Sequence, residues 1–150
     1  MLDGIFTAPG ARAPMVSLDS ALAVPGRGLE GDRYFNKQGT FWKERPDFQV
    51  TFIEAEAIEA LKRDYGLALA PQNARRNLLT RGVALNHLVG REFFLGEVRF
   101  RGIRLCEPCA HLQELTGLDV IRGLRHRGGL RAEVLSEGPL RVGDSFRVNN

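Results

Sequence analysis

Glycine and proline interrupt the apolar segments of this chain at short intervals. Its 150 residues include 17 Gly and 7 Pro, residue types that mark turns. No apolar run approaches the roughly 20 residues that a transmembrane helix needs. A chain of this length normally forms one domain, so several short strands must share one core. We therefore predict a mainly β (α+β) fold, a small β-barrel with one clear and one short helix.

The clearest strand and the clearest helix follow one another in the sequence. Residues 49–53 are rich in the β-branched and aromatic types that favour strands. In residues 54–65, Ile58 and Leu61 recur at helical spacing. Gly66 follows directly and predicts the end of this helix.

A shift in apolar periodicity predicts a bulge farther along the chain. Val98 and Phe100 alternate with arginines, but beyond Gly102 the apolar positions move to Ile103 and Leu105. A phase shift at glycine is typical of a β-bulge. The other predicted elements are an early hairpin in residues 2–22, a strand pair or one long bent strand in 93–105, a short helix in 118–125, and closing strands in 130–135 and 145–148.

The basic residues point to a small anionic ligand rather than to nucleic acid. The formal net charge is +3, and eighteen of the 21 basic residues are arginine, whose planar fork holds carboxylate and phosphate. These arginines alternate with acids, whereas a nucleic-acid site would favour a basic stripe. Residues 1–15 lack the pattern of a signal peptide. We expect a cytoplasmic protein that binds neither nucleic acid nor membrane.

Three glycines, Gly26, Gly28 and Gly31, have the spacing of a dinucleotide-binding loop. That function requires a helix immediately afterwards, and the residues that follow show no helical period. A bulged loop at the rim of a barrel is the favoured interpretation. The adjacent Asp32 and Arg33 form either a ligand contact at this rim or an internal ion pair.

Two cysteines, Cys106 and Cys109, follow a predicted strand and are separated by two residues. A structural zinc site needs two further ligands, and the three histidines show no paired spacing. A dithiol redox site normally begins a helix within a βαβ unit, and the sequence shows no parallel α/β pattern. A single thiolate on a soft or high-valent metal and two packed small side chains are further alternatives.

Two groups of basic residues are candidate anion sites. Arg75, Arg76 and Asn77 precede an apolar pair and offer two guanidiniums and an amide. A solvated loop is the alternative. The second group surrounds the glycine pair 128–129 and forms either a solvated face or the rim of an anion pocket: Arg122, Arg125, His126, Arg127 and Arg131.

Seven short motifs occur in a fixed order along the chain. They are Gly-Leu-Glu-Gly-Asp-Arg at 28–33, residues 50–61, Arg-Arg-Asn-Leu at 75–78, residues 90–96, Cys-Glu-Pro-Cys at 106–109, Gly-Gly-Leu-Arg-Ala at 128–132, and Val-Gly-Asp at 142–144. Together they resemble the MOSC domain, named for the C-terminal domain of molybdenum cofactor sulfurase. The resemblance covers about residues 15–148 and implies a single MOSC-type β-barrel domain over 1–150.

The resemblance also implies a cofactor and a site. Characterised members of the family hold a molybdenum cofactor (molybdopterin) with one cysteine on the metal, and they reduce N-hydroxylated compounds. By motif position, Cys109 resembles the metal ligand, and Arg75 and Asn77 resemble the phosphate contacts. Asp32 and Arg33 match a family position near the pterin.

His111 follows Cys109 closely, and imidazole titrates near neutral pH. We therefore take His111 as a candidate catalytic acid, with a wall histidine as the alternative. The chain departs from the amidoxime-reducing relatives at Glu54 and Glu56, where those relatives carry hydroxyl residues. Carboxylates at these positions would repel a phosphate.

Three functions remain open at this point. The chain is a molybdenum-dependent oxidoreductase acting on a small molecule with electron-transfer partner proteins, or a persulfide sulfur carrier served by a cysteine desulfurase. A non-catalytic anion-binding module is the third. Pyridoxal phosphate is not expected on this chain, because we attribute its association with the family to fusion with a separate aminotransferase-like domain.

Overall fold

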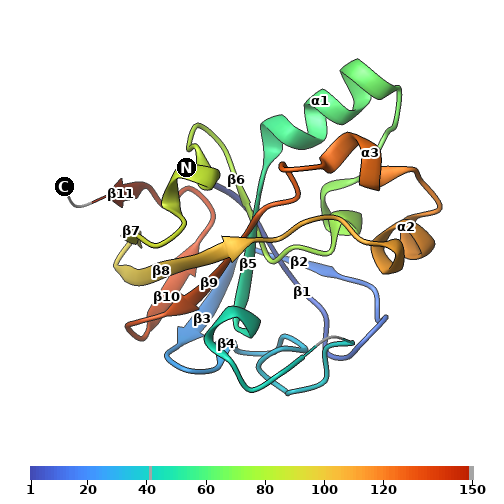
Figure 1. The fold of residues 1–150 in the computed structure, drawn as a ribbon. Coiled ribbons are helices and arrows are strands. Elements are labelled where there is room, and N and C mark those ends of the chain that lie inside the picture. Colours follow the sequence, from blue (N-terminus) through green and yellow to red (C-terminus); the bar gives the residue numbers. More distant parts are fainter. Residues whose placement is uncertain (41, 149–150) are drawn as a thin grey trace.

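Two β-sheets enclose the main core of the protein. The computed structural model describes residues 1–40 and 42–148. The larger sheet has eight strands in the order β11-β7-β8-β9-β5-β6-β1-β2, and the smaller has three in the order β10-β3-β4 (Figure 1). The strands are β1 (Leu2–Thr7), β2 (Val16–Leu18), β3 (Ser20–Val24), β4 (Gly28–Leu29), β5 (Val50–Glu54), β6 (Leu78–Thr80), β7 (Glu92–Leu95), β8 (Val98–Leu105), β9 (Leu130–Val134), β10 (Gly138–Arg141) and β11 (Phe146–Val148). The larger sheet curls into a half-barrel, and the mainly β fold class predicted from the sequence is confirmed.

Aromatic rings fill the space between the two sheets. Phe52 on β5 packs edge-on against Phe93 and Phe100, with ring centroids 5.7 and 5.4 Å away. All three side chains are fully buried. Leu29 and Leu140 of the smaller sheet belong to the same apolar cluster, so the two sheets share one core.

Three helices form a second apolar cluster on one side of the large sheet (Figure 1). They are α1 (Ala55–Tyr65), α2 (Ala110–Thr116) and α3 (Val120–Leu124). Leu61 of α1, Leu112 of α2 and Leu124 of α3 lie together in this cluster. In the part of the chain that the structure describes, no helix has the length and apolar character needed to cross a membrane.

Several local predictions are confirmed. The helix predicted after residue 53 is α1, and it ends at Gly66, which adopts the left-handed conformation with φ 68° and donates to Leu61 and Lys62 carbonyls. The early hairpin is β1 with β2. The register between β8 and β9 shifts between Gly102 and Arg104, where the bulge was predicted.

Other parts of the sequence prediction are wrong or incomplete. The described residues form three α-helices rather than two, because α2 directly follows Cys109. A parallel pair also exists, since β5 and β6 run in the same direction with α1 between them. The strands before and after α2 and α3, β8 and β9, are nevertheless antiparallel.

The glycine pair before β9 allows three segments to approach closely. Gly129 has φ 117°, and a β-carbon there would overlap the carbonyl group of Phe52 on β5. A β-carbon on Gly128 would overlap the carbonyl oxygen of Cys106. The Gly129 carbonyl accepts a hydrogen bond from the Cys106 N–H at 2.7 Å. This close packing sets the distance between the cysteine loop and the sheet.

We predict that Gly129→Ala destabilises the fold far more than Gly143→Ala. Both glycines have positive φ, but the space around Gly143 is open. Gly143→Ala should therefore show only a backbone cost of about 1 kcal/mol, whereas Gly129→Ala adds a backbone overlap and should cost several kcal/mol in total. Thermal and urea denaturation of the two variants measure the difference. Equal losses would show that the close approach contributes no stability.

Candidate functional site

The two cysteines lie at the end of β8 and differ sharply in exposure. Cys106 is buried and Cys109 is exposed, and both thiols are free. Cys109 occupies the N-cap position of α2 without a side-chain capping bond. A helix that was not predicted therefore begins at this pair, although the flanking strands form no βαβ unit.

Arg76 bonds to the backbone of the cysteine loop, residues 106–109. Its guanidinium donates to the carbonyl oxygens of Gly128 at 2.8 Å and Cys106 at 3.0 Å. Arg76 is buried, and no carboxylate among the described residues forms an ion pair with it. Its hydrogen bonds go only to carbonyl oxygens, so no carboxylate offsets its positive charge. This charge lies next to both cysteines in the same cleft.

The cleft beside Cys109, here called the cysteine cleft, collects residues from six parts of the chain. Its lining consists of Arg33, Tyr34, Thr40, Arg75, Arg76, Cys106, Glu107, Cys109, His111, Leu112, Leu115 and Arg131. The structure thus brings together four of the site residues predicted from the sequence: Cys109, His111, Arg33 and Arg75. Asp32 and Asn77 are not among the lining residues.

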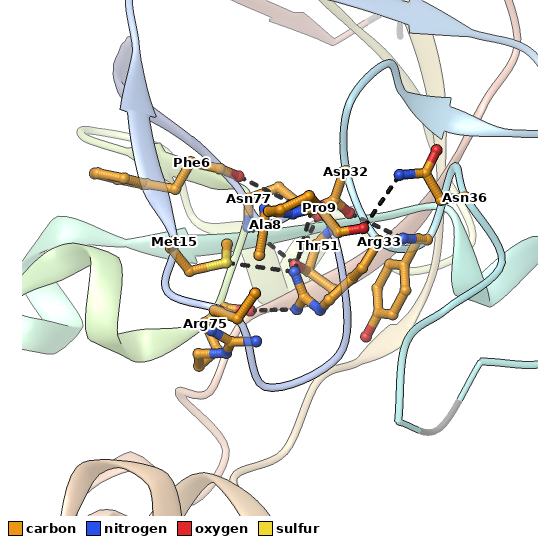
Figure 2. Close-up of polar contacts among 12 residues, drawn as sticks. Phe6, Ala8, Pro9, Met15, Asp32, Arg33, Asn36, Thr51, Arg75 and Asn77 are labelled. Carbon is orange, nitrogen blue, oxygen red and sulfur yellow. Dashed lines mark hydrogen bonds and ion pairs between the residues drawn. The ribbon is translucent and has the colours of Figure 1, made fainter.

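Asp32 and Arg33 form an internal ion pair, with 3.2 Å between Oδ1 and Nη1 (Figure 2). The Asp32 carboxylate also accepts the N–H groups of Ala8 and Tyr34. Arg33 donates its other amino group to the Arg75 carbonyl at 3.0 Å. Both side chains are buried, so the pair fixes the Arg75 backbone and adds little net charge to the cleft.

Arg75 is the cation best placed to receive an anion. Its backbone is left-handed, with φ 62°, and one amino group donates to the Ala13 carbonyl. No carboxylate among the described residues forms an ion pair with it. Burial, together with the positive charge of Arg33, lowers the pKa of Arg75 below its ordinary value. A bound anion would offset the cost of burying this unpaired charge.

Asn77 lies in the interior and connects three strands. Its Oδ1 accepts hydrogen bonds from the N–H and the hydroxyl of Thr51 on β5, and its Nδ2 donates to the Phe6 carbonyl on β1 (Figure 2). Asn77 is fully buried, and these bonds occupy both ends of its amide. The structure therefore gives Asn77 a supporting position behind the cleft.

The two glutamates expected to repel a phosphate point elsewhere. Glu54 accepts the Leu85 N–H at 3.2 Å, and Glu56 accepts the Gly82 N–H at 2.8 Å. Neither glutamate lines the cysteine cleft. This departure from the family pattern leaves the charge of the cleft unchanged.

The basic group around the glycine pair divides between two surfaces. Arg131 lines the cysteine cleft, where its Nε is buried without a hydrogen-bond partner among the described residues. Arg122 lies over the ring of Tyr65 at 5.4 Å on a separate face. His126 pairs with Glu107, with 3.1 Å between Nδ1 and Oε2.

Asp47 contacts three arginines, of which Arg104 and Arg131 line a cleft together with Cys109. The buried Asp47 carboxylate binds Arg104 at 2.7 Å and Arg45 at 2.9 Å, and its carbonyl accepts from Arg131 at 3.3 Å. Burial tends to raise the pKa of Asp47, but hydrogen bonds from Arg104 and Arg45 outweigh burial and keep this pKa below its ordinary 3.8. Asp47 was not predicted as a site residue, because Arg104 and Arg131 are 57 and 84 residues away from it in the chain.

Comparisons with known proteins agree on the family and the fold. The family model for the MOSC domain matches residues 38–147. Among solved structures, the YUAD protein from Bacillus subtilis has a TM-score of 0.81 and 17% identity, with 98% of this chain and 93% of that chain covered. YiiM from Geobacillus stearothermophilus has a TM-score of 0.77 and 13% identity over 100% of this chain and 75% of that chain. YiiM from Escherichia coli has a TM-score of 0.70 and 17% identity over 99% of this chain and 69% of that chain. A search of curated proteins found no significant match.

We predict that Asn77→Ala lowers the free energy of unfolding by about 2–4 kcal/mol, because it leaves buried groups of Thr51 and Phe6 without partners. Asn73→Ala is the matched control, since Asn73 is exposed and makes no side-chain hydrogen bond among the described residues. Chemical denaturation compares the two. An Asn77→Ala protein as stable as the control would contradict a supporting role and return Asn77 to the list of ligand contacts.

Proposed function

Because the chain belongs to the MOSC domain family, we propose that its cysteine cleft binds a molybdenum cofactor and serves a two-electron reduction of N-hydroxylated small molecules. The observation that carries this proposal is the composition of the cleft. An exposed thiol, Cys109, lies beside guanidiniums that have no carboxylate partner. Such a cleft suits a ligand that combines a thiophilic metal with a phosphate.

The donor set fits a cofactor that brings most of its own metal ligands. Among the described residues, no group of three or more His, Cys, Asp or Glu side chains could hold a metal ion. The protein would therefore contribute the single thiolate of Cys109. Arg75 is the proposed phosphate ligand, and Arg76 adds positive charge from beneath the loop. In this proposal Asn77 supports the strand that follows these two arginines.

The side chains of the cleft have distinct proposed roles in the reaction. The cofactor, when bound, supplies the two-electron chemistry at the metal. His111 lines the cleft and would donate a proton to the departing hydroxyl, so that it leaves as water, while the nitrogen would gain its proton from solvent. Leu112 and Leu115 form an apolar wall, which excludes water and strengthens the interactions of the charged groups. Electron-transfer partner proteins would supply the electrons.

A second candidate function follows from the exposure of Cys109. A persulfide carrier needs an accessible, nucleophilic thiol that accepts sulfur from a cysteine desulfurase. Cys109 meets the requirement of access. The two functions differ in the state of this sulfur, because a thiolate bound to a metal is shielded from alkylation.

We predict that Cys109→Ser abolishes molybdenum retention in protein purified from a host that makes the cofactor. Serine retains the size of the side chain but is a poor substitute for a thiolate on this metal. Cys106→Ser is the matched control and should retain more metal. Elemental analysis of both variants, with circular dichroism to confirm folding, gives the result. Equal losses would contradict a single cysteine ligand.

Alkylation of the same samples separates the two candidate functions. Cys109 should resist iodoacetamide in the loaded protein and react after the cofactor is removed. Mass spectrometry of the peptide at 105–122 detects the label. Rapid labelling of loaded protein, or an added sulfur atom after treatment with a cysteine desulfurase, would favour the carrier.

We predict that Arg75→Ala weakens cofactor binding by roughly ten- to a hundredfold, since a hydrogen bond to a charged group contributes about 1.5–3 kcal/mol. Arg91→Ala is the control. It removes the same charge from an exposed residue whose side chain makes no bond or ion pair among the described residues. Cofactor released from equal amounts of each protein is quantified. Unchanged binding in Arg75→Ala would assign the phosphate to another arginine.

A further inference from the structure

A second cleft adjoins the cysteine cleft at Cys109 and is here called the cationic cleft. It shares Thr40, Glu107, Cys109 and Arg131 with the cysteine cleft. The remaining residues of its lining are Trp42, Lys43, Phe48 and Arg104. A molecule that reaches Cys109 from this side therefore passes three cations and two aromatic side chains.

The acids near the cationic cleft are already engaged. Asp47 is the one carboxylate that pairs with Arg45 and Arg104, and only its carbonyl oxygen is bonded to Arg131. Both oxygens of Glu107 contact His126. Three cations line the cleft against the one carboxylate of Glu107, so positive charge is left over.

Three guanidiniums also surround one aromatic ring. The guanidinium carbons of Arg131, Arg45 and Arg104 lie 5.0, 5.5 and 5.9 Å from the centroid of Phe48. Gathering like charges around one side chain is costly unless an anion lies near them. Asp47 offsets part of this cost, and a second anion would offset more.

Hydrogen-bond donors remain available to such an anion. The buried Nε of Arg131 has no partner among the described residues. Arg104 uses only its Nε, on Asp47, and its two amino groups are left for a ligand. Lys43 is exposed, and its ammonium forms no ion pair within residues 1–40 and 42–148.

We propose that the cationic cleft binds a planar anionic group, an aromatic carboxylate or its equivalent, of the small molecule that reacts at the cofactor beside Cys109. The reaction part of this inference rests on the proposed function, whereas the binding part does not. A guanidinium fork holds a carboxylate with two parallel hydrogen bonds. The half-buried indole of Trp42 offers a flat apolar surface to the attached ring. The two features together select planar anions over neutral analogues.

The site contains its own reporter, because Trp42 is the only tryptophan in the chain. Nitroaromatic compounds quench tryptophan fluorescence on contact. We therefore titrate the purified full chain, at low salt, with 4-nitrobenzoate and with neutral 4-nitrobenzamide. The carboxylate should quench saturably at concentrations at least tenfold lower than the amide. Raising the ionic strength to physiological values should weaken the binding of 4-nitrobenzoate but not that of 4-nitrobenzamide.

A matched pair of charge reversals tests whether 4-nitrobenzoate binds in the cationic cleft. Lys43→Glu places a negative charge in the cleft and should weaken 4-nitrobenzoate binding by about three- to tenfold. Lys62→Glu makes the same change on the exposed surface of α1, outside both clefts, and should leave binding unaltered. Equal quenching by acid and amide, or equal losses in the two variants, would overturn the inference.

Two further readouts separate this inference from the proposed function. Lys43→Glu protein from a host that makes the cofactor should retain its molybdenum. A loss of metal in Lys43→Glu would assign the anion site to the cofactor itself and overturn the inference. Saturable binding of 4-nitrobenzoate to protein that never acquires molybdenum would support the cationic cleft while the proposed function fails. In loaded protein, Lys43→Glu should raise the KM for a carboxylate-bearing N-hydroxylated compound without changing that for its neutral analogue.

Discussion

The close packing of the glycine pair against the cysteine loop is the constraint on which the site depends. Gly129 approaches β5 so closely that a β-carbon would overlap the Phe52 carbonyl, and its own carbonyl accepts the Cys106 N–H. Arg76 then bonds to the carbonyls of Gly128 and Cys106 together. These contacts join the loop, β9 and the segment before β6 into one unit. Cys106 is buried by this packing, and Cys109, three residues later, is left at the surface where α2 begins.

The distribution of charge follows from the way the acids are used. Asp32 forms an ion pair with Arg33 and accepts hydrogen bonds from two backbone N–H groups. Asp47 forms ion pairs with Arg45 and Arg104. Burying a carboxylate is costly unless it is paired in this manner. Each pair leaves neighbouring guanidiniums with free donors and no counter-charge. Several of these guanidiniums line the two clefts that share Cys109.

The features that sequence reasoning predicted are those set by nearby residues. The helix end at Gly66 and the bulge after Gly102 depend on backbone conformations that glycine adopts locally, and both are found. The parallel pairing of β5 with β6 and the role of Asn77 depend on partners about 25 residues away or more, which no local pattern reveals. The order of motifs pointed to the correct family. It also placed Cys109 and Arg75 in one cleft, but it did not distinguish a buried amide from a ligand contact.

Cys109 lines both clefts, so in the proposed reaction the cofactor and the substrate would meet at one thiol. One cleft has Arg75 and Arg76 beneath it, and the other has Arg104 and Lys43 along its wall. Arg131 belongs to both, so a ligand on either side would alter the field experienced by the other. Because two anions near one guanidinium repel each other at short range, filling one cleft should weaken the anion affinity of the other. Coupling of this kind would arise from a single shared side chain and would require no movement of the sheets.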